Sequence, residues 1–348
     1  MKYIQYLYNY YIGYLKTHLR KRKSKSNGIF PDLGILNPSI GTTNLGDYII
    51  YESVYSKIRE TFPDGMITDF PTQLYGSYDT MRALGDKDLL FVSGTNLLTS
   101  NLNSYHQWRI HLGYNKFLKN NVILFGCGWW QYQGKINSYS KKIYKGVLSR
   151  EFIHSTRDQY TVNKLNEIGI NNVVNTSCPT LWSLSPEKCK LIPQKRGNNV
   201  VTTLTFYHKN HDLDFRMLQI LSKNYEKVYL WIQGMDDLHY FNTINDGLNN
   251  IEIVNPTLEA YDNILELDDL DYIGTRLHAG VRALQKNKRT LILAVDNRAI
   301  EIGKDVNLNV IQRERVEETQ NFIENSYETQ INLPTENINL FIKSLLKK

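Results

Sequence analysis

Cysteine is scarce in this chain of 348 residues, which contains only Cys127, Cys178 and Cys189. Because the number is odd and no Cys-x-x-Cys pair occurs, the sequence supports neither a disulfide framework nor a zinc cluster. Long apolar runs are lacking too, since no stretch approaches the roughly 20 residues that a membrane-spanning helix needs. We therefore expect a protein of a reducing cytoplasm without an integral membrane segment.

Acidic residues are absent from residues 1–30, which carry seven of the 41 lysines and arginines. The rest of the chain has 34 basic and 35 acidic residues, so the net charge of +6 belongs to this first segment. Domains that bind nucleic acids usually present a basic face, and a nearly neutral body has none. We expect no nucleic-acid partner.

Residues 1–30 form an N-terminal arm in which an aromatic stretch precedes a basic cluster. A secretion signal has the opposite order, with its charges before its apolar part. Two interpretations stay open for residues 1–26. In the first, these residues make peripheral contact with the inner face of a membrane, where each basic residue near anionic lipid contributes about 1 kcal/mol of binding free energy. In the second, they form a helix packed on its own domain, followed by a run of solvated charged residues.

From Phe30 onward, short β-rich runs alternate with longer helical patterns. This alternation predicts an α/β protein with parallel sheets covered by helices, and the length suits two domains of roughly 150 residues each. Residues 186–199 interrupt the periodicity with prolines, glycine and charges, so we predict a linker there. The predicted organisation is an N-terminal lobe over 31–185, a C-terminal lobe over 200–334 and an amphipathic helix over 335–348 that docks on either lobe.

The strands of the first half are predicted at 33–36, 89–93, 122–126, 152–156 and 173–176. Those of the second half are predicted at 200–206, 228–233, 251–254, 271–274, 290–295 and 308–311. Helices are predicted between them, for example at 45–62 and 158–168. Ligands of open parallel sheets bind beyond the carboxyl ends of the strands, so the residues that follow strands are the candidates for a site.

The first candidate segment is 41–47, which opens a helix and contains Asn44, Gly46 and Asp47. Its glycines allow backbone N–H groups to point at an anion or a sugar hydroxyl, and the helix start adds partial positive charge. The alternative is a capped turn in which Asn44 or Asp47 satisfies the first amides of the helix.

Two further candidates lie at the ends of predicted strands and are rich in small residues. One contains Gly94, Thr95 and Asn96, and the other contains Gly126, Gly128, Trp129 and Trp130. Small residues at these places clear room for a ligand over the edge of the sheet. Trp129 and Trp130 could stack on the apolar face of a sugar ring, and the alternative for one of them is packing in the core.

An arginine marks the fourth candidate segment, Ser155 to Asp158. Asp158 is explained as the N-cap of a helix. Arg157 leaves a strand at the edge where ligands bind, and a guanidinium there is suited to hold a carboxylate or phosphate through two parallel hydrogen bonds.

The fifth candidate segment, Tyr272 to Gly280, predicts a strand, a short turn and a helix. Arg276 and His278 would meet at the start of the helix, where a fixed cation, a titratable imidazole and the helix dipole converge. Such a point suits an anion with a proton donor beside it. The alternative is that His278 has only a structural role, and its pairing with Arg276 favours a functional role.

In this order, the five segments resemble the polysaccharide pyruvyltransferase family. Its hallmarks are an Asn-x-Gly-Asp, glycine-rich strand ends, a Ser/Thr-x-Arg-Asp turn and an Arg-Leu-His in the second half. Here they stand at 44–47, 94–96, 126–128, 155–158 and 276–278, and the likeness spans residues 33–302. Departures include Cys178-Pro179 where the family commonly has Asp-Pro, and Arg298 after Asp296 where a lysine is frequent.

The resemblance implies two Rossmann-like lobes with parallel sheets facing a cleft, similar to the GT-B architecture. It places the sugar acceptor on the N-terminal lobe and the donor, phosphoenolpyruvate, on the C-terminal lobe. It implies that Arg157, Arg276, Leu277 and His278 form the phosphoenolpyruvate site, with Asp296 and Arg298 among the substrate-binding residues.

From these residues we expect a reaction without metal or redox cofactor. Arg157 and Arg276 would hold the phosphate and carboxylate of phosphoenolpyruvate, while His278 would protonate its methylene carbon. Asp47 is the candidate base for the attacking hydroxyl of a carbohydrate acceptor, either lipid-linked or a finished polymer.

Two other functions fit the same residues. A nucleotide-sugar glycosyltransferase would use Arg276 and Arg298 to hold a diphosphate. A sugar-binding subunit of an envelope assembly complex would bind sugar without catalysis.

Overall fold

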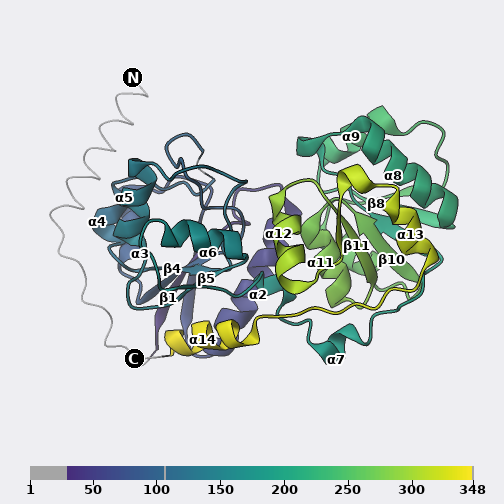
Figure 1. Ribbon diagram of the computed structural model, residues 1–348. Coiled ribbons are helices and arrows are strands. Elements are labelled where there is room, and N and C mark those ends of the chain that lie inside the picture. Colours follow the sequence, from purple (N-terminus) through teal and green to yellow (C-terminus); the bar gives the residue numbers. More distant parts are fainter. Residues whose placement is uncertain (1–29, 106, 347–348) are drawn as a thin grey trace, which may run out of the picture. The chain divides into compact units, whose positions relative to one another are not determined.

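The computed structural model describes residues 30–105 and 107–346, so the predicted N-terminal arm lies outside the described residues. The chain divides into two compact units (Figure 1). Unit 1 contains the described residues of 1–42, 51–176 and 335–348, and unit 2 contains residues 43–50 and 177–334. Within the described ranges, no helix has both the length and the apolar character to cross a bilayer.

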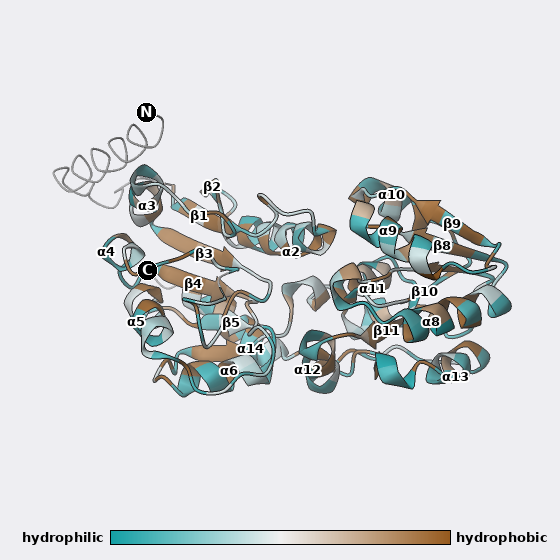
Figure 2. Ribbon diagram, turned by 90° about the horizontal axis from the view of Figure 1, so that it is seen from above, coloured by the Kyte–Doolittle hydropathy of each residue, from teal (hydrophilic) through white to brown (hydrophobic). Residues whose placement is uncertain are grey.

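Unit 1 is built on a parallel sheet with the strand order β2-β1-β3-β4. A second, two-stranded parallel sheet pairs β5 with β6, and Gly126 N donates to Ser155 O at 3.0 Å just beyond β4. All five residues of β3 are buried, and Figure 2 shows β3 and β4 in the colours of apolar residues. The strands of unit 1 are β1 (Asp32–Asn37), β2 (Met66–Pro71), β3 (Leu89–Ser93), β4 (Val122–Phe125), β5 (His154–Thr156) and β6 (Val173–Asn175).

The helices of unit 1 follow its strands, and the last of them comes from the end of the chain. They are α2 (Leu45–Thr61), of which residues 45–50 belong to unit 2, α3 (Tyr78–Gly85), α4 (Tyr114–Phe117), α5 (Ser138–Val147), α6 (Gln159–Asn166) and α14 (Thr335–Leu345).

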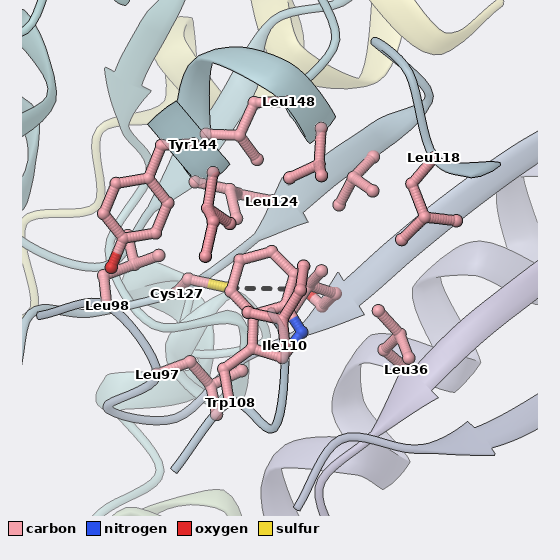
Figure 3. Close-up of a cluster of buried hydrophobic side chains, with 14 of the residues drawn as sticks. Leu36, Leu97, Leu98, Trp108, Ile110, Leu118, Leu124, Cys127, Tyr144 and Leu148 are labelled. Atoms are coloured by element: carbon pink, nitrogen blue, oxygen red, sulfur yellow. Dashed lines mark hydrogen bonds between the residues drawn. The ribbon is translucent and has the colours of Figure 1, made fainter. Parts of the chain in front are cut away.

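The core of unit 1 packs helices and loops against β3 and β4 (Figure 3). Trp108, Leu124 and Tyr144 are among its buried side chains, and the Cys127 thiol donates to the carbonyl of Val92 at 3.3 Å. Burial raises the pKa of Cys127 to about 12. This cysteine therefore acts as a small core residue rather than as a nucleophile.

Unit 2 contains a six-stranded parallel sheet with the order β12-β11-β10-β7-β8-β9. Helix α11 packs on β10 and β11, α12 on β11, and α8 on β8. The strands are β7 (Asn199–Thr202), β8 (Lys227–Trp231), β9 (Ile251–Val254), β10 (Leu270–Gly274), β11 (Arg289–Ala294) and β12 (Val310–Gln312).

Helices and 3-10 turns connect these strands of unit 2. The helices are α7 (Pro186–Cys189), α8 (His211–Asn224), α9 (Met235–Ile244), α10 (Leu258–Ile264), α11 (Leu277–Gln285), α12 (Asn297–Val306) and α13 (Glu318–Glu324). The 3-10 turns are η1 (Pro179–Leu181), η2 (Phe206–His208) and η3 (Arg313–Arg315).

These two units of parallel strands confirm the predicted α/β class. The structure has one strand that the sequence did not predict, β2, and it ends β7 at Thr202 instead of at Phe206. Strand β2 lies at an edge of its sheet and has one buried residue among six, so it lacks the apolar run that marks the other strands. Residues 203–205 leave the sheet because they bond to the turn that follows β10.

The limits of the two units differ from the predicted lobes at residues 43–50 and at residues 177–199, which both belong to unit 2. Residues 177–199, which include the predicted linker, belong to unit 2 because Leu181, Leu184 and Ile192 pack into its core. The C-terminal helix α14 docks on unit 1, where Phe341 packs edge-on against Phe125 and Ser344 Oγ accepts from Ile153 N at 3.3 Å.

One buried histidine makes the stability of unit 1 depend on pH. His154 accepts from Leu124 N through Nδ1 at 3.2 Å, and its Nε2 lies 2.9 Å from Ser149 O. Burial lowers the pKa of His154 to about 4. In the unfolded chain the ordinary pKa is near 6.5, so unfolding takes up a proton below that pH.

We expect unit 1 to lose about 3 kcal/mol of unfolding free energy through His154 as the pH falls from 6.5 to 4, and none of this between pH 7 and 9. Hydrogen exchange of the β3 and β4 amides measures this loss. The variant His154→Asn should lack this part of the pH dependence, whereas His211→Asn, at an exposed position of unit 2, should keep it. Equal pH dependence in the parent and His154→Asn would contradict this account.

Candidate functional site

A small pocket, partly open to solvent, lies within unit 2 at the carboxyl ends of its strands. The starts of α2, α11 and α12 contribute to its wall, together with the segments after β7 and β8. Three helix starts at one pocket give it partial positive charge. The residues used below are Asn44, Gly46, Tyr207, Gln233, Arg276, Leu277, His278, Asp296 and Arg298.

The turn between β10 and α11 sets the geometry of this pocket. A Cβ on Gly274 would lie 2.7 Å from Thr203 N, so only glycine allows the end of β10 to approach the end of β7 this closely. Thr203 O then accepts from Thr275 N at 3.1 Å, and Thr203 Oγ1 accepts from Arg276 N at 3.2 Å. Helix α11 starts directly at the pocket as a result.

Arg276 is the N-cap of α11, but its side chain makes no capping bond. Its guanidinium turns away from the helix amides, because Nη2 donates to both carboxylate oxygens of Asp237 at 2.8 and 2.9 Å and Nε donates to Leu204 O at 2.9 Å. The ring of Tyr207 lies 4.9 Å from the guanidinium carbon. Arg276 is therefore a fixed, charge-compensated group whose Nη1 is the nitrogen left for a ligand.

A second compensated arginine lies at the start of α12. Asp296 caps this helix by accepting from Arg298 N at 2.9 Å, and it also accepts from Arg298 Nε at 2.7 Å. Arg298 Nη2 donates to Tyr207 Oη at 3.3 Å. Tyr207 thus contacts both arginines of the pocket, and both arginines have an aspartate partner.

His278 is the second residue of α11 and lies beside the start of α2. A Cβ on Gly46 would be 3.6 Å from His278 Nδ1, so the backbone at the start of α2 lies directly beside the imidazole, and both residues line the pocket. The other ring nitrogen, Nε2, lies 3.7 Å from the Cys178 thiol. The structure thereby brings the predicted residues Gly46, Arg276 and His278 together.

Segment 41–47 forms the capped turn that was the alternative interpretation, and two of its residues, Asn44 and Gly46, also line the pocket. Asn44 Oδ1 accepts from Gly46 N at 3.2 Å, and Asn44 O accepts from Asp47 N at 3.0 Å. Asp47 is 1% exposed and does not line the pocket. The role of Asp47 as a base stays a prediction.

Gln233 supplies a polar group that the sequence analysis missed. Its backbone N–H donates to Asp237 Oδ2 at 3.0 Å, and its side chain lines the pocket. Gln233 Oε1 is buried and has no hydrogen-bond partner in the described part of the chain. A buried acceptor without a partner is costly, so this atom is suited to receive a hydrogen bond from a ligand hydroxyl or a water molecule.

Unit 1 contains the remaining predicted residues, and several of them surround Arg157. This guanidinium is 1% exposed, donates to Asn96 Oδ1 and lies 3.5 Å from Asp158 Oδ2. A Cβ on Gly128 would be 2.2 Å from Arg157 Nε. Contrary to the prediction that Gly128 clears room for a ligand, Arg157 fills that space. Asp158 is the N-cap of α6, as predicted.

The other small residues of unit 1 form sharp turns after their strands. Gly94 and Thr95 have φ values of 51° and 54°, and Gly126 has a φ of 69°. Positive φ values favour glycine, and these turns carry the chain from β3 and β4 into the loops that hold Asn96 and Gly128. They build the surroundings of Arg157.

Trp129 is buried, so the prediction that it stacks on a sugar is wrong for the conformation described. It is 0% exposed, and its indole N–H donates to Gln133 Oε1 at 3.1 Å. The neighbouring Trp130 is partly exposed and stacks on Tyr105 with ring centroids 3.8 Å apart. Alternation along an extended segment sends one tryptophan into the core and the other toward the surface.

Asp237 and Cys178 are functional candidates that the sequence did not reveal as partners of Arg276 and His278. Asp237 follows β8 and lies in the first turn of α9, where an acidic residue is usual for any helix.

Among residues 30–105 and 107–346, no group of three or more His, Cys, Asp or Glu side chains is arranged to hold a metal ion.

The buried pair of Asp237 and Arg276 generates a stability prediction. Asp237→Asn leaves the buried guanidinium without its counter-charge, and we expect unit 2 to lose about 3–5 kcal/mol of unfolding free energy. Glu317→Gln, which breaks the exposed pair with Arg216, should cost less than about 1 kcal/mol. Chemical denaturation of both variants measures the difference, and equal small losses would disprove the structural role of the Asp237 pair.

Comparisons with known proteins agree with this architecture. The structure is similar to that of UDP-GlcNAc 2-epimerase from Neisseria meningitidis bound to UDP-GlcNAc, with a TM-score of 0.51, 13% identity and coverage of 91% of this chain and 99% of that one. It is also similar to UDP-N-acetylglucosamine 2-epimerase from Rickettsia bellii, with a TM-score of 0.51, 12% identity and coverage of 92% and 95%. These likenesses confirm the GT-B-like fold class.

Sequence comparisons give the family. No curated protein shows significant similarity to the chain. The family model described as polysaccharide pyruvyl transferase, however, matches residues 44–297, which include every segment that lines the unit 2 pocket except its last two residues, Arg298 and Ala299. The chain belongs to the polysaccharide pyruvyl transferase family.

Proposed function

We propose that this protein transfers a pyruvyl group from phosphoenolpyruvate to two hydroxyls of one sugar, forming a cyclic ketal on a surface polysaccharide or its lipid-linked precursor. The observation that carries the proposal is the position of His278. It is the second residue of α11, close to Arg276, and it lines a pocket where three helices start.

The pocket suits a small anion such as phosphoenolpyruvate. Amides at a helix start donate to phosphate or carboxylate oxygens, and the helix dipole favours negative charge. Arg276 and Arg298 add donors in fixed positions, although Asp237 and Asp296 offset their charge. Binding would therefore depend on directed N–H groups more than on net charge.

The reaction would begin with proton transfer from His278 to the methylene carbon of phosphoenolpyruvate. A C–H bond forms as the N–H bond breaks, and the neighbouring carbon becomes electrophilic. A sugar hydroxyl attacks this carbon and gives up its proton. Phosphate then leaves with its bonding electrons, and a second hydroxyl of the same sugar attacks, loses its proton and closes the ketal.

Phosphoenolpyruvate and the carbohydrate acceptor are the partners in this proposal, and no metal or redox cofactor enters it. We assign Arg157 a structural role in unit 1 because Asn96, Asp158 and Gly128 enclose it. We also assign sugar stacking to the partly exposed Trp130 instead of Trp129. The proposal that residues 1–26 contact the inner face of a membrane rests on their aromatic and basic composition.

The test compares phosphate release from phosphoenolpyruvate with turnover of a panel of nucleotide sugars, using purified protein and sugar acceptors. We expect the protein to turn over phosphoenolpyruvate and none of the nucleotide sugars. His278→Ala should lower kcat about 100-fold or more, because it removes the acid. The control His239→Ala changes an exposed histidine of the same unit and should leave kcat unchanged.

Three results would count against the proposal. Turnover of a nucleotide sugar would favour a glycosyltransferase, and sugar binding without turnover of any donor would favour a binding subunit. If His278→Ala converts phosphoenolpyruvate as fast as the parent, the assignment of the acid is wrong.

A further inference from the structure

Gln233 lies between the end of β8 and the start of α9, and its backbone is anchored by a buried aspartate. Its N–H donates to Asp237 Oδ2 at 3.0 Å, and the same carboxylate accepts from Arg276 Nη2 at 2.8 and 2.9 Å. Asp237 Oδ1 also accepts from Phe206 N at 3.3 Å. Asp237 therefore joins the segments that follow β7, β8 and β10, which gives the backbone of Gln233 a fixed position at the wall of the pocket.

The side chain of Gln233 is buried without a matching contact. The residue is 6% exposed and lines the pocket, and its Oε1 has no hydrogen-bond partner among the described residues. Thr275, which lines the same pocket, has a partner for its hydroxyl in Thr205 Oγ1 at 2.8 Å. A buried polar atom without a partner is costly to the fold, and such violations are expected at functional sites.

Both placements of the amide lead to the same conclusion. The oxygen and the nitrogen of a carboxamide occupy similar space, and rotation of the group exchanges them. With oxygen at the buried position an acceptor lacks a donor, and with nitrogen there a donor lacks an acceptor. Ionised carboxylate and phosphate oxygens only accept hydrogen bonds, so an anionic ligand would be contacted by the nitrogen.

We propose that Gln233 is a substrate-binding residue of the donor site, whose side-chain Nε2 donates to a carboxylate or phosphate oxygen of phosphoenolpyruvate. This inference rests on the proposed function in the previous subsection. Because aspartates compensate both Arg276 and Arg298, an uncharged donor adds direction to the pocket without adding charge. A ligand with an oxygen at this place receives the bond, whereas a ligand without one leaves the amide unpaired and is disfavoured.

This role has opposite consequences for folding and for binding. A glutamine that stabilises the fold makes hydrogen bonds in the free protein, so its removal lowers the free energy of unfolding. A glutamine that is unpaired until a ligand binds destabilises the free protein, so an apolar residue of the same length should stabilise it. Methionine has this length and is unbranched. Gln233→Met should therefore stabilise the free protein and weaken the binding of phosphoenolpyruvate.

The first experiment measures both quantities on the full chain. In chemical denaturation, we expect Gln233→Met to move the midpoint of the unit 2 transition to a higher denaturant concentration. In calorimetric titration, its Kd for phosphoenolpyruvate should be about tenfold weaker, which corresponds to one hydrogen bond. The control Gln312→Met, at an exposed position of the same unit, should change neither quantity. A lower midpoint with an unchanged Kd would identify a structural glutamine and overturn the proposal.

The second experiment adds a negative charge at the same place. Gln233→Glu keeps the shape of the side chain and removes its donating amide, and titration at about pH 8 is well above the ordinary pKa of a glutamate. We expect the Kd for phosphoenolpyruvate to be about 100-fold weaker than in the parent, because repulsion is added to the loss of the hydrogen bond. Gln312→Glu places the same charge on the surface and should stay within about threefold of the parent. A Kd of Gln233→Glu equal to that of the parent would contradict contact between Gln233 and the anion.

Turnover separates this proposal from the proposed function. Gln233→Met should raise KM about tenfold and leave kcat within about threefold, because the bond is made to the substrate both before and during the reaction. If the parent turns over phosphoenolpyruvate and Gln233→Met has the parent KM, the role of Gln233 is wrong and the proposed function stands. If the parent neither binds nor turns over phosphoenolpyruvate, the proposed function is wrong, and the role of Gln233 fails with it.

Discussion

The turn from β10 into α11 is the constraint on which the unit 2 pocket depends. Gly274 lets the end of β10 approach Thr203. The carbonyl of Thr203 then accepts a hydrogen bond from Thr275 N, and its hydroxyl oxygen accepts one from Arg276 N. Once this turn is closed, Arg276 reaches Asp237 and Leu204, and α11 starts at the pocket with no side-chain cap. A side chain at Gly274 would separate the two strand ends and move every one of these groups.

This geometry explains why a pocket with two arginines has little net charge. Arg276 and Arg298 are each held by an aspartate, which fixes the direction of their remaining N–H groups at the expense of their charge. The Arg276 pair is buried and the Arg298 pair partly buried, and a buried ion pair adds little net stability because desolvation offsets its attraction. In the proposed function, the helix starts would provide the attraction for the anionic donor, and Tyr207, Gln233 and His278 would supply the side-chain groups that contact it.

Local pattern explains which parts of the structure the sequence predicts. Apolar runs closed by small residues predict β3, β4, β9 and β10 within a residue of their ends, and the helix signal around Asp158 predicts its N-cap. The strand, turn and helix that carry Arg276 and His278 are predicted for the same reason. Strand β2 is missed because an edge strand with few buried residues has no such pattern.

Contacts between residues distant in sequence are what the sequence does not predict. Asp237 lies 39 residues before Arg276, Cys178 lies 100 residues before His278, and neither has a motif that points to its partner. Asn96 and Gly128 were predicted to face a ligand, but they enclose Arg157, because strand ends gather side chains from several loops and a long guanidinium occupies the space. Burial of Trp129 instead of Trp130 depends on the path of one loop.

A titration of phosphoenolpyruvate into nitrogen-15-labelled protein tests the central claim most directly. The account predicts saturable shifts of the backbone amides of Leu277 and His278 at the start of α11, with the resonances of the Tyr207 and Gln233 backbone following the same binding curve. Shifts confined to other parts of unit 2, with the amides of α11 unchanged at saturation, would contradict the claim that this helix start binds the anion.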